Sequence, residues 1–308
     1  MESNVIFIQL IINGLLIGGI YALLSFGLAL IFGVVEVVNF AHGEVLMVGM
    51  YLSYVASTLL GVNIFVAMFI GMILFFIFGI TVERIIIKPI LDAPFFSQIF
   101  ATVGLAYVLK NVALMIFKAD YLKVKIGYLE SSFQIGNFCF DKARVVAFLL
   151  SVGALLVLVF FLKNTYIGRA ISAVAQSKRG AEIRGIDIHK TYAIAFGIGF
   201  MCTGLAGFSL STIYSVYPSV GDAFGLIAFI IVILGGYNNL YGIFIGALII
   251  GQLESLSGFI LSVHLKEVVY FLVFLIILVI KPSGLMGGTR KMRKRFVPKN
   301  KTVLENEA

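Results

Sequence analysis

The sequence has 308 residues, of which 61% are hydrophobic and only 12% charged, and its mean hydropathy is +1.08. Soluble domains are about 45–50% apolar and about 25% charged, so this chain carries more apolar surface than one aqueous fold can bury. A soluble fold is therefore excluded, and the composition predicts a membrane protein. The first residues include Glu2 but no Lys or Arg, unlike a cleavable signal peptide, so we expect the first apolar segment to remain in the protein.

Eight apolar stretches are each expected to cross the hydrocarbon core, which takes about 20 helical residues. In chain order they cover 5–33, 37–60, 63–87, 95–117, 144–162, 191–216, 243–262 and 267–281. The first would be about 43 Å long as a helix, so we expect it to be tilted, kinked or divided. A ninth piece, Ala223–Leu234, has only 12 residues before a Gly-Gly-Tyr-Asn-Asn break and is predicted to be a half-helix or a re-entrant segment. The sequence thus predicts an all-α polytopic membrane protein with eight to ten transmembrane helices, some of them discontinuous.

The basic residues indicate which segments face the cytoplasm, because short cytoplasmic loops are enriched in Lys and Arg. Eight basic residues lie in the tail 281–308 and six in the loop 163–190, whereas the loop 118–143 is closer to neutral. We therefore predict a transmembrane domain over 1–280, with 118–143 outside and 163–190 inside, followed by a cytoplasmic tail. The N-terminus is expected outside. The net charge of +8 is explained by anchoring beside anionic membrane lipid and not by nucleic acid.

Polar residues inside apolar stretches are candidates for a transport pathway, because a mid-membrane charge costs about 2.5–3.5 kcal/mol on insertion scales. The alternative reading is a cap and loop at the membrane interface, and for Lys110-Asn111 it is snorkelling or interhelical hydrogen bonding. A break in a helix near the midplane can also present backbone groups to a solute. The candidates on this pathway are Asn39, His42, Glu44, Gly235, Gly236, Asn238, Gln252 and Glu254.

Motifs for catalysis are missing from the sequence. The His-Gly-Glu run lacks the spacing of a zinc-protease helix, and neither a nucleophile elbow nor a phosphate-binding loop is present. We predict no catalytic residue, no metal site and no cofactor. Cys139 and Cys202 are far apart and suggest neither a disulfide framework nor a metal cluster. If ATP drives this protein, another subunit binds that ATP.

Several segments together resemble one family. The run GGIYALLSFGLALIFGVVEVVNFAHGEVLMVGMY, VERIIIKPI at 82–90, GRAISAVAQSKRGAEIRGI at 168–186, ILGGYNNLYGIFIGA at 233–247 and KPSGLMG at 281–287 are similar to the branched-chain amino-acid permeases of ABC transporters, of the LivH type. The similarity covers nearly the whole chain.

The resemblance implies an ATP-driven importer in the inner (cytoplasmic) membrane, working by alternating access on branched-chain amino acids or related small polar solutes. Its expected partners are a second permease subunit, two ATP-binding cassette ATPase subunits and an extracytoplasmic solute-binding protein. By the same resemblance, the loop that couples to the ATPase would include Ala181, Arg184, Gly185 and Ile186, although the Glu-Ala-Ala opening of such loops is absent.

Three other functions remain open at this stage. An ion-coupled secondary transporter also needs broken helices and buried ionisable groups. An importer of the same family could carry urea or amides. A non-transporting membrane scaffold could use the cytoplasmic loop to bind another protein.

Overall fold

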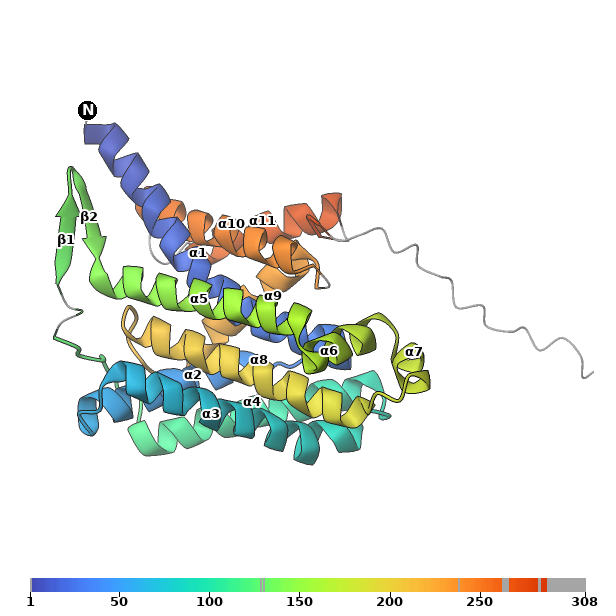
Figure 1. The fold of residues 1–308 in the computed structure, drawn as a ribbon. Coiled ribbons are helices and arrows are strands. Elements are labelled where there is room, and N and C mark those ends of the chain that lie inside the picture. Colours follow the sequence, from blue (N-terminus) through green and yellow to red (C-terminus); the bar gives the residue numbers. More distant parts are fainter. Residues whose placement is uncertain are drawn as a thin grey trace, which may run out of the picture.

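The computed structural model describes residues 2–127, 129, 131–237, 239–261, 266–281 and 284–286, and shows one bundle of helices (Figure 1). Six helices of this described part are long and apolar enough to cross a membrane, and two shorter apolar helices accompany them. The prediction of an all-α polytopic membrane protein is confirmed. The elements are α1 (Glu2–Val35), α2 (His42–Tyr54), α3 (Ile64–Val82), α4 (Phe95–Phe117), β1 (Ser132–Ile135), β2 (Phe138–Asp141), α5 (Lys142–Asn164), α6 (Tyr166–Gln176), α7 (Lys178–Ile183), α8 (Ile188–Ser211), α9 (Val220–Gly235), α10 (Leu240–Ile260) and α11 (Lys266–Ile280).

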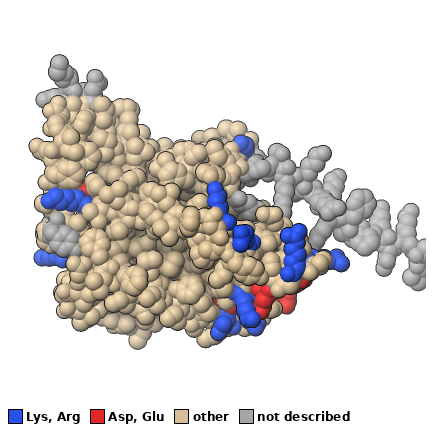
Figure 2. Space-filling view, in the orientation of Figure 1, with Lys and Arg blue, Asp and Glu red and all other residues tan. Residues whose placement is uncertain are grey.

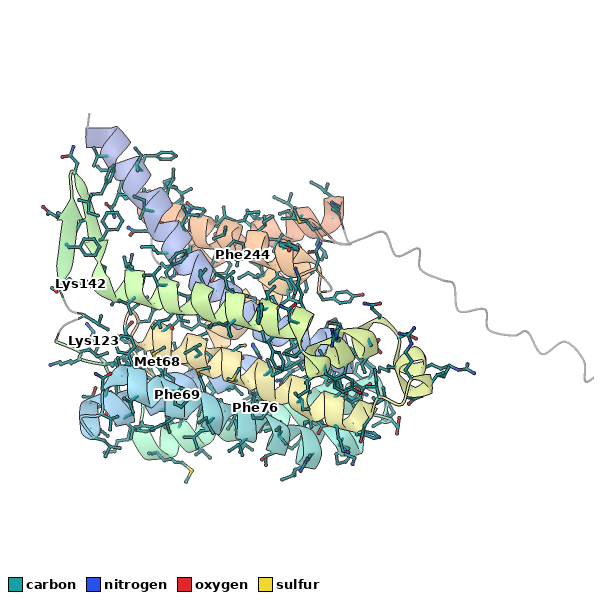
Figure 3. All side chains as sticks on the ribbon, viewed as in Figure 1. Met68, Phe69, Phe76, Lys123, Lys142 and Phe244 are labelled. Atoms are coloured by element: carbon teal, nitrogen blue, oxygen red, sulfur yellow. The ribbon has the colours of Figure 1, made fainter. Side chains whose placement is uncertain are left out.

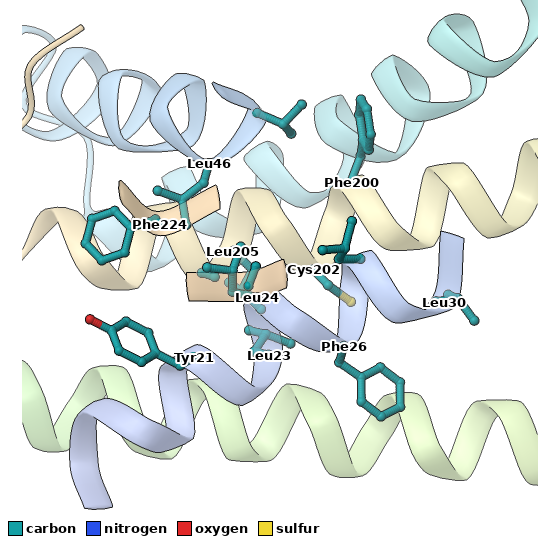
Figure 4. Packing of buried hydrophobic residues seen from close by; sticks show 14 of the residues in the cluster. Tyr21, Leu23, Leu24, Phe26, Leu30, Leu46, Phe200, Cys202, Leu205 and Phe224 are labelled. Carbon is teal, nitrogen blue, oxygen red and sulfur yellow. The ribbon is translucent and has the colours of Figure 1, made fainter. Parts of the chain in front are cut away.

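The centre of the bundle is formed by α1 and α8, which are buried along most of their length. Apolar residues of α1 such as Leu24 meet Leu205 and Cys202 of α8 (Figure 4). The α1 helix is continuous over 34 residues, or about 51 Å, and it crosses the bundle obliquely (Figure 1). A helix longer than the hydrocarbon core can tilt to keep its apolar part in lipid, so tilt is the alternative that applies here.

The outer helices α3, α4 and α5 turn large apolar side chains outward. Phe69, Phe100 and Leu156 are each more than 60% exposed, as expected for surfaces in contact with lipid or another subunit. Lys123 and Lys142 lie at the end of the bundle that carries the β1–β2 hairpin (Figure 3). On the face shown in Figure 2, charged side chains gather at this end and at the opposite end, near α6 and α7, with a broad band of uncharged residues between.

Several features differ from the sequence prediction. The stretch 37–60 does not start as a helix: residues 36–39 are non-helical, α2 begins at His42, and a π-helical turn covers Val55–Leu59. The predicted span 191–216 corresponds to α8, which ends at Ser211. The loop 118–143 contains the antiparallel hairpin β1–β2, which no pattern in the sequence indicated. The hairpin is short and isolated. The side chain of Gln9 in α1 connects it to the bundle through two hydrogen bonds to the backbone of Cys139.

The ninth apolar piece forms the helix α9, which is longer than predicted. It begins at Val220 instead of Ala223 and has 16 residues, or about 24 Å, still short of a full crossing. The chain reaches its start through residues 212–219, where Val216 pairs with Leu122 in an isolated β-bridge. Counting α9 gives four helices, α8 to α11, after the loop 163–190, and the C-terminal end of α11 lies at the same end of the bundle as this loop (Figure 1).

Candidate functional site

Two short helices, α2 and α9, meet at their first turns. A Cβ atom added to Gly43 would lie 2.1 Å from the carbonyl oxygen of Gly221, and one added to Gly221 would lie 2.7 Å from the carbonyl oxygen of Gly43. Only glycine permits backbones to approach this closely. The acidic residue that follows each glycine, Glu44 and Asp222, is thereby brought to the same place. An acidic residue in a first turn is also favourable beside the positive end of a helix dipole.

A cavity of about 310 Å³ opens between α2, α4 and α9, and three charged side chains line it. Lys110 of α4 forms an ion pair with Asp222. The third charged residue, Glu44, is only 4% exposed, and its Oε2 atom has no hydrogen-bond partner among the described residues. The rest of the lining is mostly apolar, and includes Phe40 and Phe229, whose rings lie 5.3 Å apart.

His42 precedes the same glycine but points into the core instead of the cavity. It is fully buried, and its Nε2 atom lies 3.0 Å from the carbonyl oxygen of Leu24 and 3.1 Å from Oγ1 of Thr203. Thr203 in turn donates to the carbonyl oxygen of Gly199. The imidazole therefore joins α2 to α1 and α8, as a buried polar group must be paired.

Asn39 lies just before α2 in a turn, not on the helix face with His42. Its Oδ1 atom accepts a hydrogen bond from the amide of Ala41, while its Nδ2 atom is buried without a partner in the described part of the chain. Asn and Asp commonly form such turns because the side-chain oxygen accepts a hydrogen bond from the backbone amide two residues further along the chain.

A second charged cluster surrounds Glu254 of α10, which is 6% exposed. Its carboxylate accepts hydrogen bonds from the hydroxyls of Tyr21 and Tyr214 and forms a 2.7 Å ion pair with Lys266, the first residue of α11. The ring of Phe224 in α9 packs edge-on against both tyrosines (Figure 4 shows Tyr21 and Phe224). The α9 helix therefore stands between the two clusters, with Asp222 in the cavity and Phe224 against the partners of Glu254.

Gln252 joins helices α10 and α1. Its Nε2 atom donates to the carbonyl oxygen of Ile11. Its side-chain amide packs directly against Gly14, where an added Cβ atom would lie 2.7 Å from Cδ of Gln252.

The glycine break between α9 and α10 is a tight turn. Gly235 ends α9, and Gly236 has a φ of +85°, a conformation that favours glycine. Asn239 then caps α10 by accepting from the amides of Tyr241 and Gly242. Asn238, another predicted site residue, lies outside the described residues.

The predicted coupling segment forms two short helices, α6 and α7, at one end of the bundle (Figure 1). Ala181 is buried, and its carbonyl oxygen accepts from the amides of Arg184 and Ile186, which closes α7. Gly185 makes this turn possible with a φ of +75°, while Ile186 packs partly against the core. Arg184 is exposed.

The next helix, α8, starts at a capping aspartate. The Asp187 carboxylate accepts a hydrogen bond from the amide of Lys190, and this bond lowers the pKa of the Asp187 carboxyl. The coupling segment thus leads directly into the most buried helix of the bundle.

The structure brings Glu44 together with two residues that the sequence interpretation did not place in the site. For Lys110 the sequence favours snorkelling or interhelical hydrogen bonding, and its bond to Asp222 of α9 is of the second kind; the sequence interpretation makes no prediction for Asp222. A signal for Asp222 does exist: Val-Gly-Asp at 220–222 opens a short apolar segment in the same way as His-Gly-Glu at 42–44. The partners of Glu254 lie 12, 40 and 233 positions away in the chain, at Lys266, Tyr214 and Tyr21, so no local pattern could have identified them together. Within the described residues, no group of three or more His, Cys, Asp or Glu side chains could hold a metal ion.

Comparisons with known proteins agree with this architecture. Residues 10–278 match the family described as "Branched-chain amino acid transport system / permease component". The chain is 30% identical to the high-affinity branched-chain amino acid transport permease LivH of Salmonella typhimurium, covering 93% of this chain and 97% of LivH. It is 27% identical to BraD of Pseudomonas aeruginosa, covering 91% and 96%.

A solved structure, PsaBC from Streptococcus pneumoniae in complex with Fab, has a similar fold. The TM-score is 0.50 at 14% sequence identity, and the match covers 92% of this chain and 97% of that one. Together, the family match and the similarity to LivH over almost the whole length agree with the multi-pass helical bundle. This chain belongs to the family of permease components of branched-chain amino acid transport systems, and it is a multi-pass protein of the inner membrane.

Proposed function

We propose that this chain is the membrane-spanning subunit of an ATP-driven importer for branched-chain amino acids or closely related solutes, working by alternating access. It would pair with a second permease subunit, two ATPase subunits and an extracytoplasmic binding protein. The relatives LivH and BraD, which match more than nine-tenths of the chain, are transport permeases for branched-chain amino acids, which supports this substrate class. In this proposal the N-terminus is outside and the C-terminus is cytoplasmic.

The observation that carries the proposal is the α6–α7 unit at the end of the bundle (Figure 1). Ile183 of α7 is 80% exposed although it is a large apolar residue, and exposed basic residues such as Arg184 surround it. An apolar residue within a charged rim is typical of a protein interface. The unit is also tied to the rest of the bundle, because Lys178 forms a 3.2 Å ion pair with Glu36 at the end of α1. In this proposal, a displacement of α7 is passed to α8, which follows it in the chain, and to the end of α1.

The function is tested by ATP-dependent uptake into vesicles that contain the full complex, with a panel of labelled branched-chain amino acids, other amino acids, urea and amides. We expect uptake that needs both ATP and the ATPase subunits. Uptake that persists without ATPase subunits and collapses with an ionophore would instead establish a secondary transporter.

The coupling role of α7 is tested in the same vesicles. We expect Ile183→Asp to lower uptake by about tenfold or more and to weaken co-purification of the ATPase subunits, since a buried interface residue costs about 2 kcal/mol when lost. Ile183→Val should behave like the wild type. Ile135→Asp is the matched control, because Ile135 is 61% exposed on the hairpin at the opposite end; it should leave ATPase co-purification unchanged. Normal ATPase binding and uptake by Ile183→Asp would contradict the assignment.

The orientation can be tested with the native cysteines. Cys139 is exposed on the hairpin, whereas Cys202 is buried in α8. With the N-terminus outside, a membrane-impermeant maleimide added to intact spheroplasts should label the wild type, and Cys139→Ser should abolish the labelling. Labelling of Cys139 only after the membrane is permeabilised would reverse the proposed orientation.

A further inference from the structure

The Lys110–Asp222 ion pair is exposed on a membrane-spanning face. Its side chains are 30% and 58% exposed in the isolated chain, although Lys110 lies well inside the span α4 and Asp222 lies in the first turn of α9. Charged groups are costly in hydrocarbon, so they face water or another protein. The side of the bundle formed by α2, α4 and α9 therefore faces an aqueous pathway or a partner subunit instead of lipid.

A second cavity connects this site with one end of the bundle. It has a volume of about 440 Å³ and shares Tyr107 and Lys110 with the charged cavity. Its other walls include Tyr121, Tyr217 and Ser219, which belong to the segments that follow α4 and precede α9. The two cavities are adjacent, since they share Tyr107 and Lys110, and together they are called the groove; it extends from these segments to Glu44.

The groove holds more acidic than basic groups. Two carboxyl groups, those of Glu44 and Asp222, face one ammonium group, that of Lys110, and the ion pair joins Lys110 to Asp222. Glu44 presents a carboxylate oxygen without a partner while it is 96% removed from solvent. A buried acceptor of this kind is costly unless a donor reaches it, so a ligand that carries a cationic donor would be stabilised beside Glu44.

We propose that this groove contains a binding site for a zwitterionic α-amino acid with an apolar side chain. The ammonium group of the ligand lies between Glu44 and Asp222, and its carboxylate binds the ammonium group of Lys110. The apolar wall of Phe40, Leu226 and Phe229 receives the side chain. The volume is at the lower end of the ~300–1,000 Å³ usual for ligand pockets, which suits a small solute. The inference rests on the proposed function and specifies where that function recognises its substrate.

The proposed site predicts which single substitution abolishes the binding of a ligand that lacks one of the two charges of leucine. Saturation-transfer NMR on the purified transporter complex, without binding protein, would use leucine, leucinamide and 4-methylpentanoate as probes. Leucinamide lacks the carboxylate and 4-methylpentanoate lacks the ammonium. We expect Glu44→Gln and Lys110→Met each to abolish the leucine signal. Glu44→Gln should abolish the leucinamide signal but spare 4-methylpentanoate, and Lys110→Met should do the reverse.

Uptake gives the second measurement, and Glu83→Gln gives the control. Glu83 is also a buried glutamate with an unpartnered oxygen within the described structure, but it lies beyond α3 and does not line the groove. Glu44→Gln and Lys110→Met should lower amino-acid uptake by about tenfold or more, as expected for a lost charged hydrogen bond, whereas Glu83→Gln should not. Co-purification with the partner subunits shows whether each variant is assembled. If Glu44→Gln does not assemble, the uptake and binding of Lys110→Met alone test the proposed site.

The outcomes separate the two proposals. If the wild type takes up no amino acid in the presence of ATP, the proposed function is wrong. If the wild type takes up leucine, and the assembled variants keep wild-type uptake and the same response to all three probes, the function stands and the binding site is overturned.

Discussion

Gly43→Ala is expected to prevent normal assembly of the bundle. The added methyl group would lie 2.1 Å from the Gly221 carbonyl oxygen and 2.8 Å from the Cα atom of Gly225. These are backbone atoms of α9, so no side-chain rotation can relieve the clash, and the helices must separate. Overpacking in a core costs about 1–3 kcal/mol and sometimes more, and we expect a loss of about 3 kcal/mol here. Thermal stability of the purified protein, followed by size-exclusion chromatography after heating, measures the loss.

The matched control for this substitution is Gly153→Ala in α5. A Cβ atom at Gly153 meets nothing within 4 Å in the described part of the chain, and the position is in a helix interior. Alanine is favoured over glycine in such a position by about 0.5–1 kcal/mol, so this variant should be as stable as the wild type or slightly more stable. If Gly43→Ala and Gly153→Ala have equal thermal stability, α2 and α9 do not touch at these glycines.

Lys266→Met is expected to destabilise the protein because it leaves the buried carboxylate of Glu254 without its counter-ion. Removing one partner of a buried ion pair typically costs about 3–5 kcal/mol. Lys266 is 23% exposed and Glu254 still accepts from Tyr21 and Tyr214, so we expect a value near the lower limit, about 3 kcal/mol. Thermal denaturation of the purified complex is the measurement.

A double substitution separates the lost ion pair from any other role of the lysine. Lys266→Met combined with Glu254→Gln removes the charge that the single variant leaves unpaired, so the double variant should recover most of the stability. Lys190→Met is the control, since Lys190 pairs with Asp187 on the surface, and such pairs contribute little. A double variant that is less stable than Lys266→Met would show that the pair is not the source of the effect.

The positions of the helices could be predicted well where apolar composition alone decides them. The predicted stretch 95–117 coincides with α4, and 144–162 lies within α5, because a span in lipid must satisfy its own backbone hydrogen bonds and helix is the conformation that does so. The prediction was less accurate around 37–60 and 212–219. There the chain leaves the helix, and residues far away in the sequence bond its backbone: Oγ1 of Thr102 donates to the carbonyl oxygen of Val38, and Leu122 pairs with Val216.

The candidate site could be predicted only in part. Glu44 and Glu254 stand out in an apolar sequence because of the cost of a charge in the membrane. The residues that lie beside them do not stand out, because Lys110 is 66 positions from Glu44 in the chain, and Tyr21 is 233 positions from Glu254. Nor does the sequence distinguish a polar residue that lines a cavity from one that joins helices. His42 and Gln252 proved to bond to the backbone of α1, whereas Glu44, two residues from His42, lines the groove.

The sequence by itself determined that the protein lies in lipid, that its fold is helical, and which family it belongs to. These properties follow from local composition and from motifs along the chain, so each can be recognised in a single stretch of sequence. Only the tertiary structure decided that His-Gly-Glu and Val-Gly-Asp meet, and that a lysine from α4 faces their two carboxylates. The reason is steric: the glycines permit backbone contact between α2 and α9, and that contact fixes where the acidic side chains point.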